Sequence, residues 1–289
     1  MTLAAPAAPC LSSQEIDAFR NDGFLVVDEV FDEAEVTVWR ELIESPAVLD
    51  SEKHGHLAES TLHLLELTAK HPSFLNLARD PRIVGRLQDL MGPDIALSHS
   101  KLAAQAKTAG KGGFGWHQDF AFFPHTNTNL IAVMVMLDDA TPENGCMRMV
   151  RGSHGHGLLN HADSGGNFTY QCQEKSRWES RPDLVTPITP RAGGISLHHC
   201  LTLHGSGPNP SGLPRRGLVF QYRADDAYQL ADTVFTDTGL LISGERRGLV
   251  RCETAIWRLP MRPERRDGRG FGSAWNQMGE FAIRCDEGE

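Results

Sequence analysis

The residues best suited to chemistry stand in the motif Trp116-His117-Gln118-Asp119. Alternate residues of a β-strand point to the same face, so we expect the His117 imidazole and the Asp119 carboxylate to point the same way. Such a pair can hold one metal ion. A second histidine from elsewhere would complete a triad that leaves three adjacent coordination positions open, as non-haem Fe(II) oxygenases require. With 13 histidines in the chain, the pair alone is weak evidence.

The second histidine is expected in the segment 203–216, LHGSGPNPSGLPRR. His204 ends an apolar stretch, Ser206 follows in a turn, and Arg215 opens the next predicted strand. If the two strands are antiparallel neighbours, the His204 imidazole and the Arg215 guanidinium reach one cavity. A guanidinium binds a carboxylate through two parallel hydrogen bonds. We therefore predict His204 as a metal ligand, and Arg215 with Ser206 as the site for the distal carboxylate of 2-oxoglutarate.

Three blocks of sequence extend this interpretation: WHQD at 116–119, DDATPENGCMRMVRGSH at 138–154, and HGSGPN through PRR from 204 to 216. Together they resemble the phytanoyl-CoA dioxygenase family of Fe(II)- and 2-oxoglutarate-dependent oxygenases, over about residues 12–225. The resemblance implies a mainly β double-stranded β-helix (jelly roll, cupin-like) with flanking α-helices. It implies Fe(II), 2-oxoglutarate and dioxygen, with ascorbate as in vitro reductant.

Spacing within the family also bears on this chain. The second histidine precedes the 2-oxoglutarate arginine by eleven residues in such enzymes, which selects Arg215 over Arg216. Arg151 stands where family members often have proline, and we expect a surface change there. Because Asp119 is present, a halogenase, which replaces this carboxylate with a small residue, is disfavoured.

Other side chains are weaker candidates for the same cavity. Further contacts to 2-oxoglutarate are considered at Lys107, Gln105 and His99. The substrate pocket is considered to include Trp116, Phe123, His125, His156 and Arg223. For Arg223 the alternative is an ion pair at the rim with Asp225 or Asp226. For His198, on the same predicted strand face as His204, a packing or supporting role is favoured over metal ligation.

The elements that must position these residues follow from periodicity and turn signals. A Ser12/Glu15 capping box opens a helix through Arg20, before a strand at 24–27. Further helices are predicted at 33–43 and 72–91, the latter interrupted near Asp80-Pro81. Strands are predicted at 95–105, 114–120, 130–137, 146–150, 195–203 and 216–223. The stretch 157–185 has little periodicity and is expected to be a loop that is either disordered or functional.

We interpret the chain as one oxygenase domain over 12–289 behind a disordered leader at 1–11. Within the domain we expect a helical flank at about 12–94, a jelly-roll core at about 95–225 and a C-terminal extension at 226–289.

Composition excludes several classes of protein. A net charge of -9 argues against nucleic-acid binding, which needs a basic surface. The longest apolar run, 130–137, is far too short to span a membrane. Six dispersed cysteines without paired spacing indicate free thiols in a reducing compartment, so a cytoplasmic location is expected. We expect a monomer or homodimer.

The functional prediction is a dioxygenase that oxidises, and most simply hydroxylates, a C–H bond of a small metabolite. Desaturation or cyclisation stays open as the outcome. Two alternatives use the same scaffold: a Zn(II) or Mn(II) hydrolase or isomerase, and a non-catalytic ligand sensor. Arg215 favours the first interpretation, since neither alternative needs a fixed partner for a five-carbon diacid. The substrate cannot be identified from sequence or fold.

Overall fold

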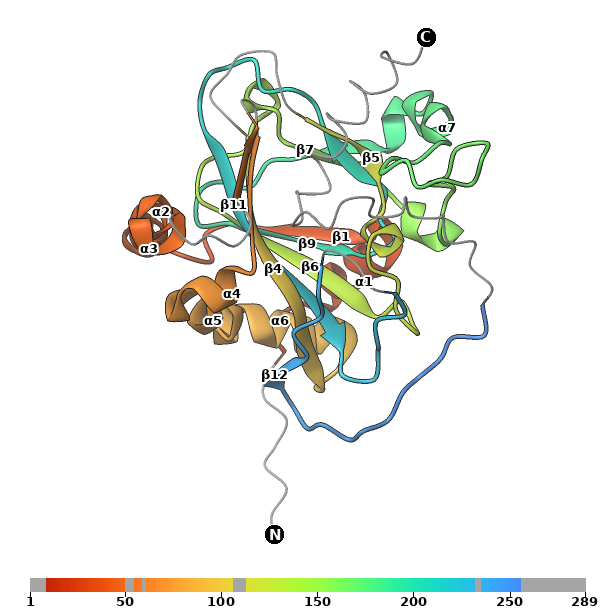
Figure 1. Cartoon of the computed structure of the whole chain (residues 1–289), viewed down its shortest axis with the longest axis horizontal. Coiled ribbons are helices and arrows are strands. Elements are labelled where there is room, and N and C mark those ends of the chain that lie inside the picture. Colours follow the sequence, from red (N-terminus) through yellow and green to blue (C-terminus); the bar gives the residue numbers. More distant parts are fainter. Residues whose placement is uncertain (1–8, 50–54, 59–60, 106–112, 232–234, 256–289) are drawn as a thin grey trace, which may run out of the picture.

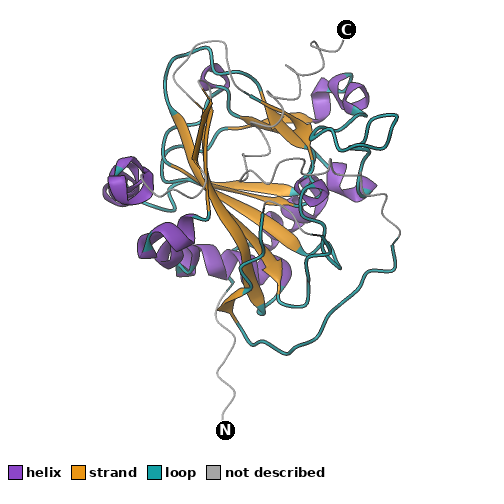
Figure 2. Ribbon diagram, viewed as in Figure 1, coloured by secondary structure: helices purple, strands orange, loops and turns teal. Residues whose placement is uncertain are grey.

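Two antiparallel β-sheets face each other and form the framework of the protein (Figure 1). The structure is a computed structural model that describes residues 9–49, 55–58, 61–105, 113–231 and 235–255. This architecture, with helices packed outside the larger sheet (Figure 2), is the jelly roll that the sequence predicted.

The larger sheet has eight strands. In spatial order they are β1 (Phe24–Val27), β9 (Ile195–His199), β6 (Leu130–Met136), β11 (Arg215–Ala224), β4 (Ile95–Gln105), β3 (Thr61–Leu65) and β2 (Gly55–Ala58), while β12 (Leu240–Ser243) also pairs with β4. Every residue of β6 is buried, which shows that both faces of the sheet are covered at its centre. This explains why 130–136 is an uninterrupted apolar run.

The smaller sheet has four strands, and it carries part of the site. Their order is β5 (Phe114–His117), β10 (His204–Ser206), β7 (Met147–Val150) and β8 (Val185–Ile188). A Cβ atom at Gly205 would lie 2.8 Å from the Phe114 carbonyl oxygen, so the missing side chain lets β10 pack closely against β5.

Helices cover the outer face of the larger sheet (Figure 2). They are α1 (Ser13–Asp22), α2 (Glu33–Glu44), α3 (Pro46–Leu49), α4 (Leu67–Lys70), α5 (Pro72–Ala78) and α6 (Pro81–Met91), with α7 (Lys175–Glu179) beside the smaller sheet. The predicted capping box of Ser12 and Glu15 is present. The predicted interruption also holds, because Asp80 caps α6 and Pro81 occupies its first turn.

The two faces of the larger sheet have different roles, and β11 illustrates the division. Leu218, Phe220 and Tyr222 belong to the main apolar core beneath the helices. The alternating residues Arg215 and Val219 line a cavity between the sheets. Alternation along the strand thus separates structural side chains from those available for chemistry.

Three strand predictions were wrong in informative ways. The strand predicted at 114–120 ends at His117, and Asp119 begins a 3-10 turn, Asp119–Ala121. The strand predicted at 195–203 ends at His199, and a turn carries the chain to the other sheet, where β10 begins. Consequently β10 and β11 are not neighbours: β10 pairs with β5 and β7, whereas β11 pairs with β4 and β6.

The larger sheet also includes strands from outside the predicted jelly-roll core of about 95–225. Strands β1, β2 and β3 come from the predicted helical flank and β12 from the predicted extension, and all join the larger sheet. Leu11 is buried, and the Asp89 carboxylate accepts hydrogen bonds from the Cys10 and Leu11 amides. The 157–185 stretch contains α7 and buries Trp178. Residues 1–8 and 256–289 lie outside the described residues.

Among the described residues, no helix has both the length and the apolar character needed to cross a membrane.

Candidate metal centre

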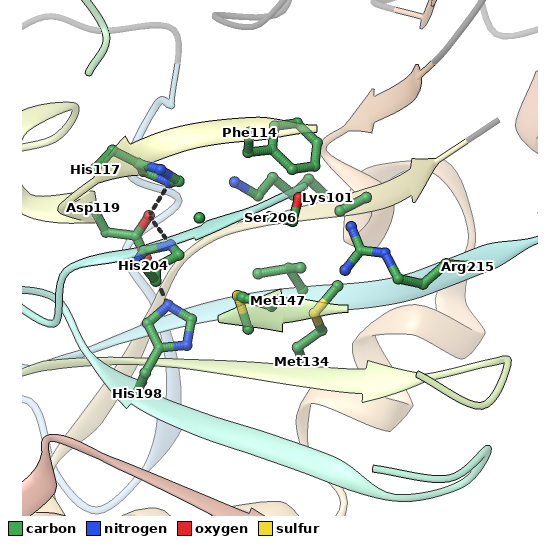
Figure 3. Close-up of a pocket in the computed structure, with 13 residues that line it drawn as sticks. Lys101, Phe114, His117, Asp119, Met134, Met147, His198, His204, Ser206 and Arg215 are labelled. Atoms are coloured by element: carbon green, nitrogen blue, oxygen red, sulfur yellow. Dashed lines mark hydrogen bonds and ion pairs between the residues drawn. The ribbon is translucent and has the colours of Figure 1, made fainter. Parts of the chain in front are cut away.

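Three predicted ligands meet between the two sheets (Figure 3). The side chains of His117, Asp119 and His204 are buried, and their ligand atoms lie within 4.8 Å of one another. His117 and His204 are register partners on β5 and β10, and the 3-10 turn brings Asp119 beside them. The Asp119 Oδ1 atom is 3.9 Å from His117 Nε2 and 3.8 Å from His204 Nε2.

Backbone hydrogen bonds fix the orientation of both imidazoles. The Nδ1 atom of His117 lies 2.8 Å from the Gly115 carbonyl oxygen, and that of His204 lies 2.9 Å from the Thr202 carbonyl oxygen. A carbonyl only accepts, so each Nδ1 donates and each neutral ring keeps its Nε2 lone pair for the centre. Burial lowers the pKa of His117 well below its ordinary value and that of His204 to about 4. Both rings are therefore neutral, as metal ligation requires.

The carboxylate of Asp119 is held ionised. Burial alone would raise its pKa, but a hydrogen bond from His198 and the nearby charge of Lys101 keep it well below the ordinary value. His198 Nε2 lies 3.2 Å from Asp119 Oδ2, and Oδ1 faces the two other histidines. Two neutral imidazoles and one carboxylate on one side of a cavity fit a divalent metal with open positions.

Hydrogen bonds of Gln118 hold the backbone between His117 and Asp119 in place. Its side chain is buried and donates to the carbonyl oxygens of Gly157 and Leu201 at 2.9 and 2.7 Å, and it accepts from the Leu159 amide at 2.7 Å. Its own amide donates to His161 Nε2 at 3.1 Å. Gln118, which points away from the metal ligands, therefore links the WHQD motif to the loop at Gly157 and Leu159 and to the loop at Leu201.

A cavity of about 60 Å³ extends from the three ligands toward Arg215 (Figure 3). Its walls are mainly apolar and come from both sheets. They comprise Lys101, Ala103, Phe114, His117, Asp119, Met134, Met147, His198, His204, Gly205, Ser206, Arg215 and Val219.

Arg215 occupies the end of the cavity opposite the histidines (Figure 3). Its side chain is buried, and no described residue forms an ion pair with it. Burial lowers the pKa of Arg215 to about 10, so the guanidinium stays charged at neutral pH. Gln105, its register partner on β4, donates to Ser206 Oγ at 2.9 Å. Arg215, Ser206 and Gln105 thus form a group of polar side chains able to receive a carboxylate.

Arg216 has a different environment. Its guanidinium donates to the Asp138 carboxylate at 2.8 and 2.9 Å and to Glu44 at 2.7 Å. Adjacent strand residues point to opposite faces, which separates this paired arginine from the unpaired Arg215.

Several weaker candidates lie away from the cavity. Phe123 and His99 pack together with ring centroids 4.7 Å apart, and Phe235 stacks on His99 at 4.6 Å. His125 is buried, and its Nδ1 donates to the Phe123 carbonyl oxygen. His156 is exposed beside Trp178. These aromatic side chains belong to the surrounding packing.

Trp116 packs in a small apolar cluster with Arg148 over its ring. Arg223 pairs with Asp237 at 2.9 Å rather than with either aspartate considered from the sequence, because the chain folds back toward β4 after β11. Arg151 is exposed, as expected. Lys107 lies outside the described residues.

The sequence interpretation missed Lys101, Phe114, Met134 and Met147 as cavity residues. For Lys101 a signal was present, because it lies two residues from Ala103 and four from Gln105 on the same strand face. The methionines gave no such signal, since a buried methionine is most often ordinary core.

Comparison with known proteins agrees with this geometry. Residues 19–217 match the phytanoyl-CoA dioxygenase (PhyH) family. A probable alpha-ketoglutarate-dependent hypophosphite dioxygenase of Stutzerimonas stutzeri is 36% identical over 158 residues, which span 54% of each chain. A methylphosphonate hydroxylase of Gimesia maris is 28% identical over 84% of this chain and 90% of its own. An ectoine dioxygenase of Streptomyces anulatus is 26% identical over 76% and 81%.

Solved structures support the same fold. EctD from S. alaskensis, solved with 2-oxoglutarate and 5-hydroxyectoine, superposes with a TM-score of 0.62 at 24% identity and covers 90% of both chains. Because the family match includes the WHQD motif and the segment that carries His204, fold, motifs and site geometry agree. The chain belongs to the phytanoyl-CoA dioxygenase (PhyH) family.

Proposed function

We propose that this chain is an Fe(II)- and 2-oxoglutarate-dependent dioxygenase that hydroxylates a small metabolite. One observation carries the proposal: a buried His-Asp-His cluster and a buried, unpaired arginine lie at opposite ends of one cavity. An uncompensated buried charge is costly, so its presence indicates an anionic ligand.

His117, Asp119 and His204 would hold the metal, and Arg215 with Ser206 would hold the distal carboxylate of 2-oxoglutarate. When bound, iron supplies the oxidation chemistry: substrate R–H, 2-oxoglutarate and dioxygen give R–OH, succinate and carbon dioxide. The protein fixes both ends of the co-substrate, and the walls formed by Met134, Met147 and Val219 exclude bulk water.

Supporting side chains maintain this arrangement. Nδ1 of each ligating histidine is bound to a backbone carbonyl, which keeps the rings from turning. His198 donates to the outer oxygen of Asp119 and keeps the carboxylate directed at the centre. Gln105 orients the Ser206 hydroxyl.

The named substrates of the relatives (hypophosphite, methylphosphonate and ectoine) are small polar molecules. We infer a small-molecule substrate for this chain as well, with no nucleic-acid or membrane partner. A cytoplasmic location is proposed from the free cysteines of the described residues. A monomer or homodimer is proposed as the working form.

The test is succinate formation from 2-oxoglutarate with Fe(II), ascorbate and dioxygen, over a substrate panel. His117→Ala and Asp119→Ala should abolish succinate formation and lower the iron retained after dialysis. His71→Asn, at the start of α5, is the matched histidine control and should retain both, since Asn also caps helices. Full turnover with normal iron content in His117→Ala would refute the ligand assignment. Hydrolysis or isomerisation without succinate would favour a Zn(II) or Mn(II) enzyme, and ligand binding without turnover a sensor.

A further inference from the structure

A second cation, Lys101, projects into the same cavity and has no role in the function proposed above (Figure 3). It lies in the middle of β4, paired with Val219 of β11 on one side and Leu65 of β3 on the other. Its ammonium lies 5.1 Å from the centroid of the Phe235 ring. The strand pairing on both sides fixes the backbone from which this side chain enters the cavity.

The ammonium of Lys101 lies on the metal side of the cavity. Its charge contributes to the pKa shifts of His117, Asp119 and His204. In Figure 3 the nitrogen is directed toward the histidine cluster and away from Arg215. The two cations therefore serve different parts of the cavity.

No described residue forms a hydrogen bond or ion pair with the Lys101 ammonium. Asp119 is the carboxylate that acts on it, but the oxygens of Asp119 face two histidines and His198. Burial lowers the pKa of Lys101, which reflects the loss of water around the charge. The face of one phenylalanine ring compensates for this only weakly. An anion beside Lys101 would relieve the remaining cost.

A charge count shows that 2-oxoglutarate does not supply all of this negative charge. Lys101 and Arg215 bring two positive charges to the cavity and Asp119 brings one negative charge, while the two histidine ligands, His117 and His204, are neutral. A divalent metal adds two positive charges, and a 2-oxoglutarate dianion removes two. One positive charge remains, at the end where the substrate must meet the metal.

We propose that Lys101 receives the negatively charged group of the substrate, and that the substrate is a small oxyanion such as a phosphinate, phosphonate or short carboxylate. This inference rests on the proposed function and narrows it. The size of the cavity agrees: about 60 Å³ leaves little room beside the co-substrate, since one water molecule already needs roughly 10–15 Å³. The apolar walls at Ala103 and Val219 would contact the uncharged part of the molecule.

The experiment titrates small ligands into anaerobic holoenzyme with Fe(II) and 2-oxoglutarate, by isothermal calorimetry. The probes are hypophosphite, methylphosphonate and acetate, with acetamide as the uncharged match for acetate. We expect at least one oxyanion to bind wild type and acetamide not to compete. Lys101→Met should weaken that binding by about 30-fold or more, since it removes the cationic partner of the bound anion within the cavity. Lys101→Arg should restore most of the affinity, and Lys175→Met, an exposed lysine on α7, should have no effect.

Separate titrations of 2-oxoglutarate identify the other outcomes. If Lys101→Met weakens 2-oxoglutarate and leaves the oxyanion unchanged, Lys101 serves the co-substrate and the inference is overturned. It is equally overturned if none of the three oxyanions binds wild type, or if acetamide binds as well as acetate. Failure of the proposed function looks different, because wild type would then bind neither iron nor 2-oxoglutarate. If wild type forms succinate, the proposed function is supported whatever the result at Lys101.

Discussion

Replacing Arg215 with methionine should have two effects of opposite sign. It should weaken 2-oxoglutarate binding, and it should stabilise the protein that lacks 2-oxoglutarate. Both effects follow from one fact: the guanidinium is buried, and no described residue neutralises it. Methionine fills a similar volume without charge, so the substitution isolates the electrostatic contribution.

The structure gives the magnitudes. Burial lowers the pKa of Arg215 from its ordinary value to about 10, which corresponds to about 3 kcal/mol against the charged form. Removing that penalty should raise the free energy of unfolding by about 1–3 kcal/mol, because an isosteric apolar residue often stabilises such a position. Loss of the carboxylate partner should cost about 3 kcal/mol of binding, which is roughly 100-fold in affinity.

Urea unfolding without 2-oxoglutarate and anaerobic calorimetry with it measure the two effects. Arg216→Met is the neighbouring control, and it should behave in the opposite way. Because Arg216 is paired with Asp138, its loss should destabilise the fold slightly and leave 2-oxoglutarate affinity within about threefold of wild type. Unchanged 2-oxoglutarate affinity in Arg215→Met would refute the anchoring role. A destabilised Arg215→Met protein would refute the view that the free site carries an uncompensated charge.

Removing the metal with a chelator should lower the midpoint of thermal unfolding, since a ligand at 100 times its Kd adds about 2.7 kcal/mol to the free energy of unfolding. Identical midpoints before and after Fe(II) is restored would argue against a metal at the triad. Gln118→Leu should lower the free energy of unfolding in urea by about 3 kcal/mol or more, because three backbone groups, two of them buried, lose their hydrogen-bond partner. An unchanged value would show that the loops hold without it. Hydrogen bonds from Arg82 lower the pKa of Asp80 and of Glu35 in the folded protein, so their stabilisation is complete near neutral pH and is lost as pH falls through the folded values. The stability advantage of wild type over Arg82→Met should therefore shrink between about pH 5 and pH 3, and a constant difference in urea midpoints would contradict this.

The sequence was most informative where local pattern and chemistry coincide. Strand composition and turn signals predicted β4, β6 and β11 nearly to their ends, and the Ser12/Glu15 capping box predicted where α1 begins. The family and the jelly-roll fold are confirmed. The spacing between His204 and Arg215 also distinguished Arg215 from Arg216, and the structure gives these two arginines different environments.

The predictions that failed concern features that depend on contacts between segments far apart in the sequence. Local pattern could not show that the chain changes sheets between His199 and His204, because the turn is fixed by hydrogen bonds such as Phe120 N–H to the Cys200 carbonyl. It also misjudged how Asp119 reaches the centre. The aspartate does so from a 3-10 turn rather than by strand alternation. The cavity walls were missed because Met134 and Met147 acquire their role only when the sheets face each other.

The separation of the two sheets has a consequence for how such an enzyme can diversify. The histidines of the metal centre are supplied by the smaller sheet, with Asp119 in the turn that follows β5. Lys101 and Arg215, by contrast, come from paired central strands of the larger sheet. A substitution at position 101 therefore changes the charge in the cavity without removing a metal ligand or altering a strand edge. Single replacements on this rigid strand therefore offer a route to new specificities, in nature or by design, that keeps all three metal ligands in place.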